Sequence, residues 1–118
     1  VSTLLYDSEE KLAWAKQAID EKMYADGIYH TYNVFINTAK AMLLTVDQKP
    51  STQIQTINDF QKHFVEGGMI SGRTDFKQFV LRMSKQEPTE LFALEYWNDA
   101  KKFLEDVYAF KNLEKQIA

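Results

Sequence analysis

Apolar residues recur every three or four positions along most of the chain, which is the spacing of one face of an α-helix. The first such stretch opens after Asp7 or Ser8, and the second follows an interruption at Asp26 and Gly27. Five helical segments are predicted. Their inward-facing positions are Leu12, Ala15, Ile19 and Met23; Ile28, Tyr32, Phe35, Ala39, Met42 and Val46; Ile54, Ile57, Phe60 and Phe64; Phe76, Phe79, Val80 and Met83; and Ala93, Tyr96, Trp97, Ala100, Phe103, Leu104, Val107 and Phe110.

Capping residues mark several of the predicted helix ends. Thr52 and Gln55 have capping-box spacing, the short fourth segment begins near Thr74 or Asp75, and Pro88 fits the first position of the last helix. No stretch alternates apolar and polar residues as a strand does. The sequence therefore predicts an all-α fold, an up-and-down bundle of four or five helices in a single domain over residues 1–118. Because the chain begins with Val, we interpret it as a processed protein or as a domain excised from a longer one.

Composition excludes several classes of function. The 118 residues include no cysteine, so disulfides, thiolate metal sites and a cysteine nucleophile are ruled out. A net charge of -3 argues against a surface that coats nucleic acid. No apolar run is long enough to span a membrane, so we expect a cytoplasmic protein with no membrane partner.

The second helical segment has very few charges. Lys40 is its one charge between Gly27 and Thr45, whereas ten charged residues lie between Thr89 and Ala118. Either this helix is central in the bundle, or its second face meets another subunit in a homodimer. The residues on that side are His30, Asn33, Val34, Asn37, Ala41 and Leu44, and the polar ones among them form a ridge with Lys40 that presents hydrogen-bonding groups to a ligand or to a neighbouring helix.

A basic segment follows the third helix. Arg73, Lys77, Arg82 and Lys85 stand against Asp75 alone, which gives a local charge of +3 in an acidic chain. These four residues are the candidate anion-binding site. In a regular helix Arg73 and Lys77 point away from Arg82, so a solvated helix is the alternative interpretation.

Motifs for catalysis, metal binding or cofactor binding are missing from the sequence. There is no Gly-x-Ser-x-Gly elbow, no phosphate-binding glycine loop and no His-Glu-x-x-His. His63 follows Asp59 by four residues, but no second histidine is near it in sequence, and Glu-x-x-His pairs of di-iron bundles are lacking. We therefore predict no metal and no cofactor.

A set of segments resembles a known family. The run Ile-Tyr-His-Thr-Tyr-Asn-Val-Phe-Ile-Asn-Thr-Ala-Lys-Ala-Met-Leu-Leu at 28–44 is followed by Ile-Asn-Asp-Phe at 57–60, His-Phe-Val at 63–65, Gly-Met-Ile at 68–70 and Arg82. Together they resemble the HEPN family (higher eukaryotes and prokaryotes nucleotide-binding), and the likeness covers Leu12 to Tyr108. The resemblance implies a helical bundle that pairs as a dimer.

The active members of that family resemble metal-independent ribonucleases that use an Arg and a His with four to six residues between them. Arg82 stands where the Arg is expected, but the matching positions hold Glu87, Pro88 and Thr89. Since no imidazole is placed there to move a proton at neutral pH, we predict no catalytic residues and no enzyme activity in this chain.

The run from His30 to Asn37 and the Asp-Ala-Lys-Lys-Phe-Leu at 99–104 also resemble HEPN-type modules found behind bacterial nitrite and sulfite reductases. The predicted function is a noncatalytic module for dimerisation or regulation, with a fused or partner enzyme such as a sulfite or nitrite reductase-like protein. The alternative is a nucleotide- or RNA-binding protein that uses the basic segment.

Overall fold

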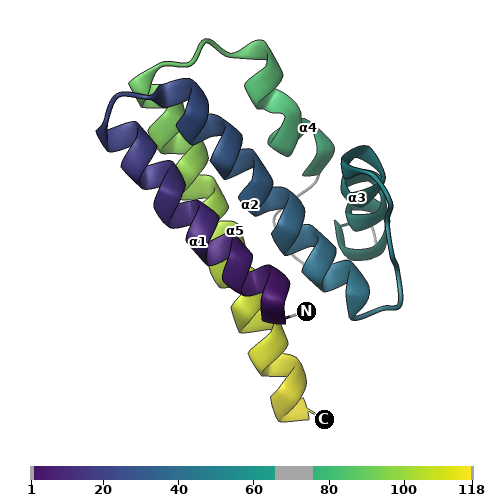
Figure 1. The fold of residues 1–118 in the computed structure, drawn as a ribbon. Coiled ribbons are helices and arrows are strands. Elements are labelled where there is room, and N and C mark those ends of the chain that lie inside the picture. The colour runs from purple at the N-terminus through teal and green to yellow at the C-terminus, as the bar shows by residue number, and fades with distance from the viewer. Residues whose placement is uncertain (1, 66–75, 118) are drawn as a thin grey trace.

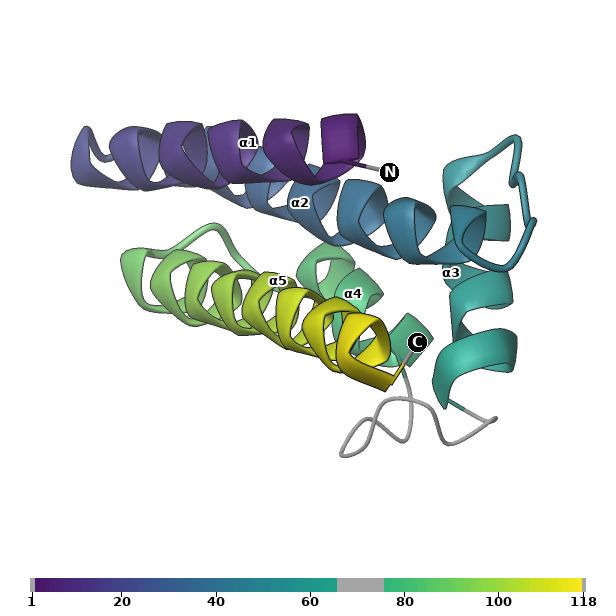
Figure 2. The ribbon, with the colours of Figure 1, turned by 90° about the horizontal axis from the view of Figure 1, so that it is seen from below.

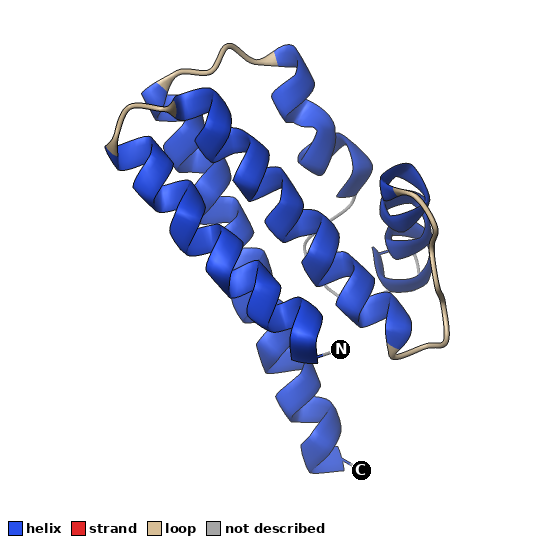
Figure 3. Ribbon diagram, in the orientation of Figure 1, coloured by secondary structure: helices blue, strands red, loops and turns tan. Residues whose placement is uncertain are grey.

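A computed structural model describes residues 2–65 and 76–117. Its five α-helices are α1 (Ser2–Asp20), α2 (Tyr24–Leu44), α3 (Gln53–Phe60), α4 (Phe76–Leu81) and α5 (Glu90–Ile117). A π-helical turn, η1 (Gln61–Val65), follows α3, and a 3-10 turn, η2 (Arg82–Lys85), follows α4. The described ranges contain helices and connecting loops but no strand (Figure 3), so the prediction of an all-α fold is confirmed.

Three long helices form the body of the molecule. α1 and α2 run antiparallel and side by side, with α5 packed against both (Figure 1). Seen from below, α1 and α2 make one layer, α4 and α5 make the other, and α3 stands across one end (Figure 2). The described part is elongated, with extents of 44 × 26 × 24 Å. The arrangement is thus a three-helix bundle with two short helices at its side, not a regular up-and-down series.

The first helix begins at Ser2, earlier than the predicted start at Asp7 or Ser8. Ser8 does not cap the helix, because its hydroxyl donates to the Leu4 carbonyl oxygen at 3.0 Å and lies fully buried. Thr38 of α2 donates its own hydroxyl to Ser8 Oγ at 3.1 Å. The predicted start was wrong because a serine inside a helix can bond back to the carbonyl four residues earlier.

The break between α1 and α2 lies before Tyr24, where Lys22 adopts a left-handed φ of 66°. Gly27, predicted as part of that break, instead lies inside α2. A Cβ there would come within 2.7 Å of Ile19 Cγ1 and 3.2 Å of the Ala15 carbonyl oxygen. Gly27 therefore serves close packing of α2 on α1, and it does not end a helix.

Side-chain caps begin α3 and α5. The Gln55 backbone N–H donates to Thr52 Oγ1 at 3.0 Å, which confirms the predicted cap of α3. Pro88 is not the first residue of α5. It precedes the capping residue Thr89, whose Oγ1 accepts from the backbone N–H of Phe92 at 3.2 Å.

The core is built around a cluster of phenylalanines. The ring of Phe103 on α5 lies 5.7 Å from Phe35 of α2, 5.4 Å from Phe60 of α3 and 5.3 Å from Phe76 of α4, measured between centroids. All four side chains are fully buried. The predicted inward positions are buried or half-buried, with the exceptions of Met23, Val46 and Ile54, which are exposed.

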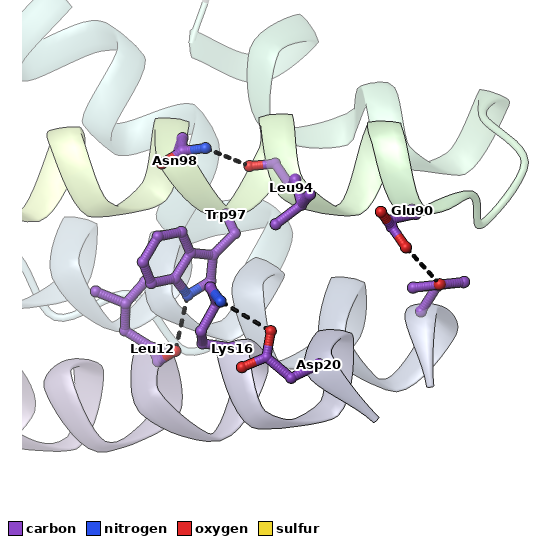
Figure 4. Close-up of polar contacts among 8 residues, drawn as sticks. Leu12, Lys16, Asp20, Glu90, Leu94, Trp97 and Asn98 are labelled. Carbon is purple, nitrogen blue, oxygen red and sulfur yellow. Dashed lines mark hydrogen bonds and ion pairs between the residues drawn. The ribbon is translucent and has the colours of Figure 1, made fainter. Parts of the chain in front are cut away.

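Polar contacts join α1 to α5 (Figure 4). The indole N–H of Trp97 donates to the Leu12 carbonyl oxygen at 2.8 Å, and Lys16 pairs with Asp20 beside it at 2.8 Å. On the outer side of α5, Lys102 pairs with Asp106 at 3.6 Å, and Lys101 Nζ lies 5.6 Å from the Trp97 ring centroid. Trp97 thus lies at the boundary of the core and joins the two layers.

Candidate functional site

The basic segment forms an open groove along α4 and η2. Its volume is about 640 Å³, and it is lined by Lys77, Gln78, Leu81, Arg82, Ser84 and Lys85. Three of the four predicted cations therefore share one surface, while Arg73 lies outside the described residues. Lys77 is exposed, whereas Arg82 is half-buried and pairs with Asp99 of α5, so lining the same groove does not contradict the expectation that the two side chains point in different directions.

Arg82 is held by contacts from within the chain. Its Nη1 donates to the Phe79 carbonyl oxygen at 2.7 Å, and its Nη2 pairs with the Asp99 carboxylate of α5. The guanidinium carbon lies 4.4 Å from the ring centroid of Phe79, 5.0 Å from that of Tyr96 and 5.6 Å from that of Phe92. A guanidinium that pairs with a carboxylate, donates to a backbone carbonyl and lies close to aromatic rings is fixed in position. Its main task in this structure is to fasten η2 to α5.

A second contact anchors the same segment. The buried hydroxyl of Tyr96 donates to the Val80 carbonyl oxygen of α4 at 2.6 Å. Burial raises the pKa of Tyr96 far above its ordinary value, and the nearby positive charge of Arg82 offsets part of that rise. Tyr96 therefore stays neutral and keeps donating over the whole ordinary pH range.

The second face of α2 is covered by another helix of the same chain. Val34 and Ala41 are fully buried. They follow Gly27 by seven and fourteen residues, so they lie on the side of α2 that packs against α1. Of the two interpretations of the charge-poor helix, the central position accounts for Val34 and Ala41. The prediction that a second subunit covers them was wrong, because α1 supplies that surface.

The remaining residues of the predicted ridge reach the surface. His30, Asn33, Asn37 and Leu44 are half-buried, as is Lys40. Asn33 Nδ2 donates to its own helix, at the Tyr29 carbonyl oxygen 3.0 Å away. The ridge is thus a solvent-facing stripe of α2 and not a seam inside the fold.

The two histidines lie in different surroundings. The His30 ring lies 6.0 Å from the ring of Trp14 on α1 in an edge-on arrangement, and His63 lies in η1. Among the described residues, no group of three or more His, Cys, Asp or Glu side chains converges as a metal site would require. Within the same ranges, no helix combines the length and apolar character needed to cross a bilayer.

Sequence reasoning missed the partners of Arg82. Asp99 is seventeen residues away and Tyr96 belongs to a different helix, so no local spacing joins them to Arg82. The available signal was the position of Tyr96 and Asp99 three residues apart, which puts both on one side of α5. That signal predicts a shared side of a helix but names no partner.

The chain is 30% identical over 114 residues to a protein of Methanocaldococcus jannaschii named "Putative toxin MJ0605", an alignment that covers 91% of this chain and 85% of the relative. No family model matches the chain. No solved structure matches it either.

Proposed function

We propose that this chain is a HEPN-like, toxin-type helical module that acts by binding and not by cleaving RNA. The chain belongs to the family of the Methanocaldococcus jannaschii protein. That membership and the geometry at Arg82 support the proposal. The relative carries the word toxin in its name, and the HEPN resemblance rests on the segments between Leu12 and Tyr108. The connection with a reductase stays a prediction, and the proposal does not depend on it.

The observation that carries the proposal is the occupied guanidinium of Arg82. One oxygen of the Asp99 carboxylate, Oδ2, pairs with Arg82 Nη2 and holds the place that a phosphate oxygen would take. An RNA phosphate would have to displace Asp99 before it could take the same position. Arg82 is therefore built into the fold at the position where the resemblance expects a nuclease residue.

The proton-transfer group of such a nuclease has no counterpart beside Arg82. The chain contains two histidines, His30 on α2 beside Trp14 and His63 in η1, and neither is among the residues that contact the Arg82 side chain. Glu87, Pro88 and Thr89 occupy the positions where the resemblance expects an imidazole. General acid–base cleavage at neutral pH is most often carried out by an imidazole, and none stands at these three positions.

The test is an RNA cleavage assay with the whole chain. A 5′-labelled single-stranded RNA is incubated with the purified protein, with Arg82→Ala and with Lys101→Ala as an exposed cation outside the groove. We expect the same background for all three, and no growth arrest when the wild-type chain is expressed in bacteria. Cleavage by the wild type that Arg82→Ala abolishes and Lys101→Ala retains would overturn the proposal.

A second candidate function, binding of an anionic ligand, is favoured by the groove itself. Lys77 and Lys85 are exposed there, and Ser84 adds a hydroxyl. Binding of a labelled nucleotide would be measured for the wild type, for Lys77→Ala/Lys85→Ala and for a matched pair outside the groove, Lys49→Ala/Lys101→Ala. Binding that falls steeply with salt and is lost in the groove pair alone would support this function. Equal loss in both pairs would show only a general charge effect.

A further inference from the structure

A small cavity lies where the first turns of α1 meet the second half of α5. Its volume is about 260 Å³, and its lining residues are Leu5, Tyr6, Glu9 and Tyr108, here called the tyrosine cavity. Leu5 and Tyr6 precede Glu9 by four and three residues, so α1 presents all three on one side. Tyr108 comes from α5. The tyrosine cavity shares no residue with the basic groove of α4 and η2.

The carboxylate in this cavity is held by one neighbour. The Tyr108 hydroxyl donates to Glu9 Oε1 at 3.1 Å. Burial, together with this hydrogen bond, raises the pKa of Tyr108, so the hydroxyl keeps its proton and keeps donating at neutral pH. Within the described ranges, Glu9 has no other side-chain partner, and no lysine or arginine forms an ion pair with it. The cavity is therefore lined by a positioned negative charge that this part of the chain does not neutralise.

Two aromatic rings line the cavity together with that charge. Tyr6 is 68% exposed, so its ring is accessible to a ligand, and Tyr108 is half-buried. The face of an aromatic ring is partly negative and attracts cations. Leu5 adds apolar surface, since its side chain is almost completely buried beside the cavity. All the charged and aromatic groups of the tyrosine cavity thus favour a positively charged ligand.

The donor set distinguishes between kinds of cation. Hard metal ions such as Ca²⁺ and Mg²⁺ need several oxygen ligands. Among the described residues, no group of three or more His, Cys, Asp or Glu side chains converges, and Glu9 is the one carboxylate that lines the cavity. Aromatic rings beside a single carboxylate suit a cation whose charge is surrounded by alkyl groups, because the rings contact the alkyl groups and the carboxylate balances the charge.

We propose that the tyrosine cavity binds an organic ammonium ion, with Glu9 as its counter-ion and the rings of Tyr6 and Tyr108 against its alkyl groups. A small free amine and the lysine side chain of a partner protein both present this chemistry. The proposal goes beyond the proposed function, because it names a ligand class for a site outside the basic groove. The RNA cleavage assay does not bear on it.

Binding is tested with the whole chain by an NMR titration that follows the ring signals of Tyr6 and Tyr108. The probe is choline, and the control is its neutral carbon analogue, in which a tert-butyl group replaces the trimethylammonium group. We expect saturable shifts with choline and binding of the neutral analogue that is weaker by at least about tenfold. A lysine derivative with both backbone ends blocked separates the two sources of the ligand. Binding of that derivative supports a protein side chain, and binding of choline alone supports a small free amine.

Matched variants locate the binding. Glu9→Gln keeps an oxygen that accepts from Tyr108 but removes the charge, so it should weaken choline binding by at least about fivefold. Glu10→Gln, at the exposed neighbouring carboxylate outside the cavity, should leave binding unchanged. Tyr6→Leu should weaken binding by about threefold, whereas Tyr29→Leu, at an exposed tyrosine elsewhere, should not.

Circular dichroism shows whether each variant is folded. Three results would overturn the inference. The first is the absence of saturable shifts with both choline and the lysine derivative. The second is equally strong binding of the neutral analogue, because the site would then recognise shape and not charge. The third is an equal loss of binding in Glu9→Gln and Glu10→Gln, because the attraction would then come from the overall acidity of α1.

Discussion

The helix α2 and the segment α4–η2 differ clearly in their density of charged residues. α2 has two formal charges in 21 residues, whereas the ten residues of α4 and η2 carry Lys77, Arg82 and Lys85. In α2, the lack of charge reflects burial by neighbouring helices of the same chain. In α4–η2, one of the charges reflects an internal partner, Asp99. A charge pattern therefore describes the surroundings of a helix, but it does not say whether the same chain or another molecule provides them.

The two regions meet at Phe103, and removing this ring should have the largest effect. Phe103→Ala takes away the ring that contacts Phe35 on α2 and Phe76 on α4. A large-to-small change in a filled core costs about 3–5 kcal/mol of unfolding free energy. Urea denaturation measures this loss of unfolding free energy. Phe110→Ala, at a half-buried ring 6.4 Å from Phe64, is the matched control and should cost clearly less. Equal losses would show that the two regions do not share one core.

The role of Arg82 as a fastening residue makes a second prediction. Arg82→Ala should lower the free energy of unfolding by about 2 kcal/mol, since it removes a partly buried ion pair and several ring contacts. Arg82→Lys keeps the charge but not the planar fork, and it should recover less than half of that loss. Lys77→Ala, an exposed cation of the same groove, should change stability by less than about 0.5 kcal/mol. Equal stability of Arg82→Ala and Lys77→Ala would show that Arg82 is not a structural residue.

The same helices show which features of this fold could be predicted from the sequence and which could not. The stripes of α2 and α5 and the Thr52 cap were readable because they depend on residues three or four apart. Two other features depend on how helices that are distant in sequence come together. These are the pairing of Arg82 with Asp99 and the burial of Val34 against α1, and local residue spacing cannot predict either. The glycine at 27 was misread for the same reason, because its purpose is a contact with Ile19 on another helix.

Gly27 offers a test of the cover on α2. Gly27→Ala places a methyl group 2.7 Å from Ile19 Cγ1, so α1 and α2 must shift. Overpacking costs about 1–3 kcal/mol, and the helix propensity gained from alanine returns about 1 kcal/mol, so we expect a net loss of about 0–2 kcal/mol in thermal or urea unfolding. In an Ile19→Ala background the same change should be neutral or stabilising. A stabilising effect of Gly27→Ala on its own would contradict close packing at this point.

Removal of the Tyr96 hydroxyl should have the smallest effect on stability. This change separates the anchoring of α4 from the packing of the core. Tyr96→Phe keeps the ring but removes the hydroxyl that donates to the Val80 carbonyl, which should cost about 1 kcal/mol.

Because burial raises the pKa of Tyr96 in the folded state, the folded protein holds its proton where the unfolded chain has lost it. The stabilisation is therefore complete below about pH 10 and declines as the pH rises above that value. Measured by urea unfolding between about pH 8 and pH 11, the wild type should lose stability more steeply than Tyr96→Phe. The pKa values of Tyr24, Tyr32 and Tyr108 are also raised, but these residues are present in both proteins, so their contribution cancels in the difference. Parallel curves for the two proteins would mean that the Tyr96 hydroxyl does not hold α4 against α5.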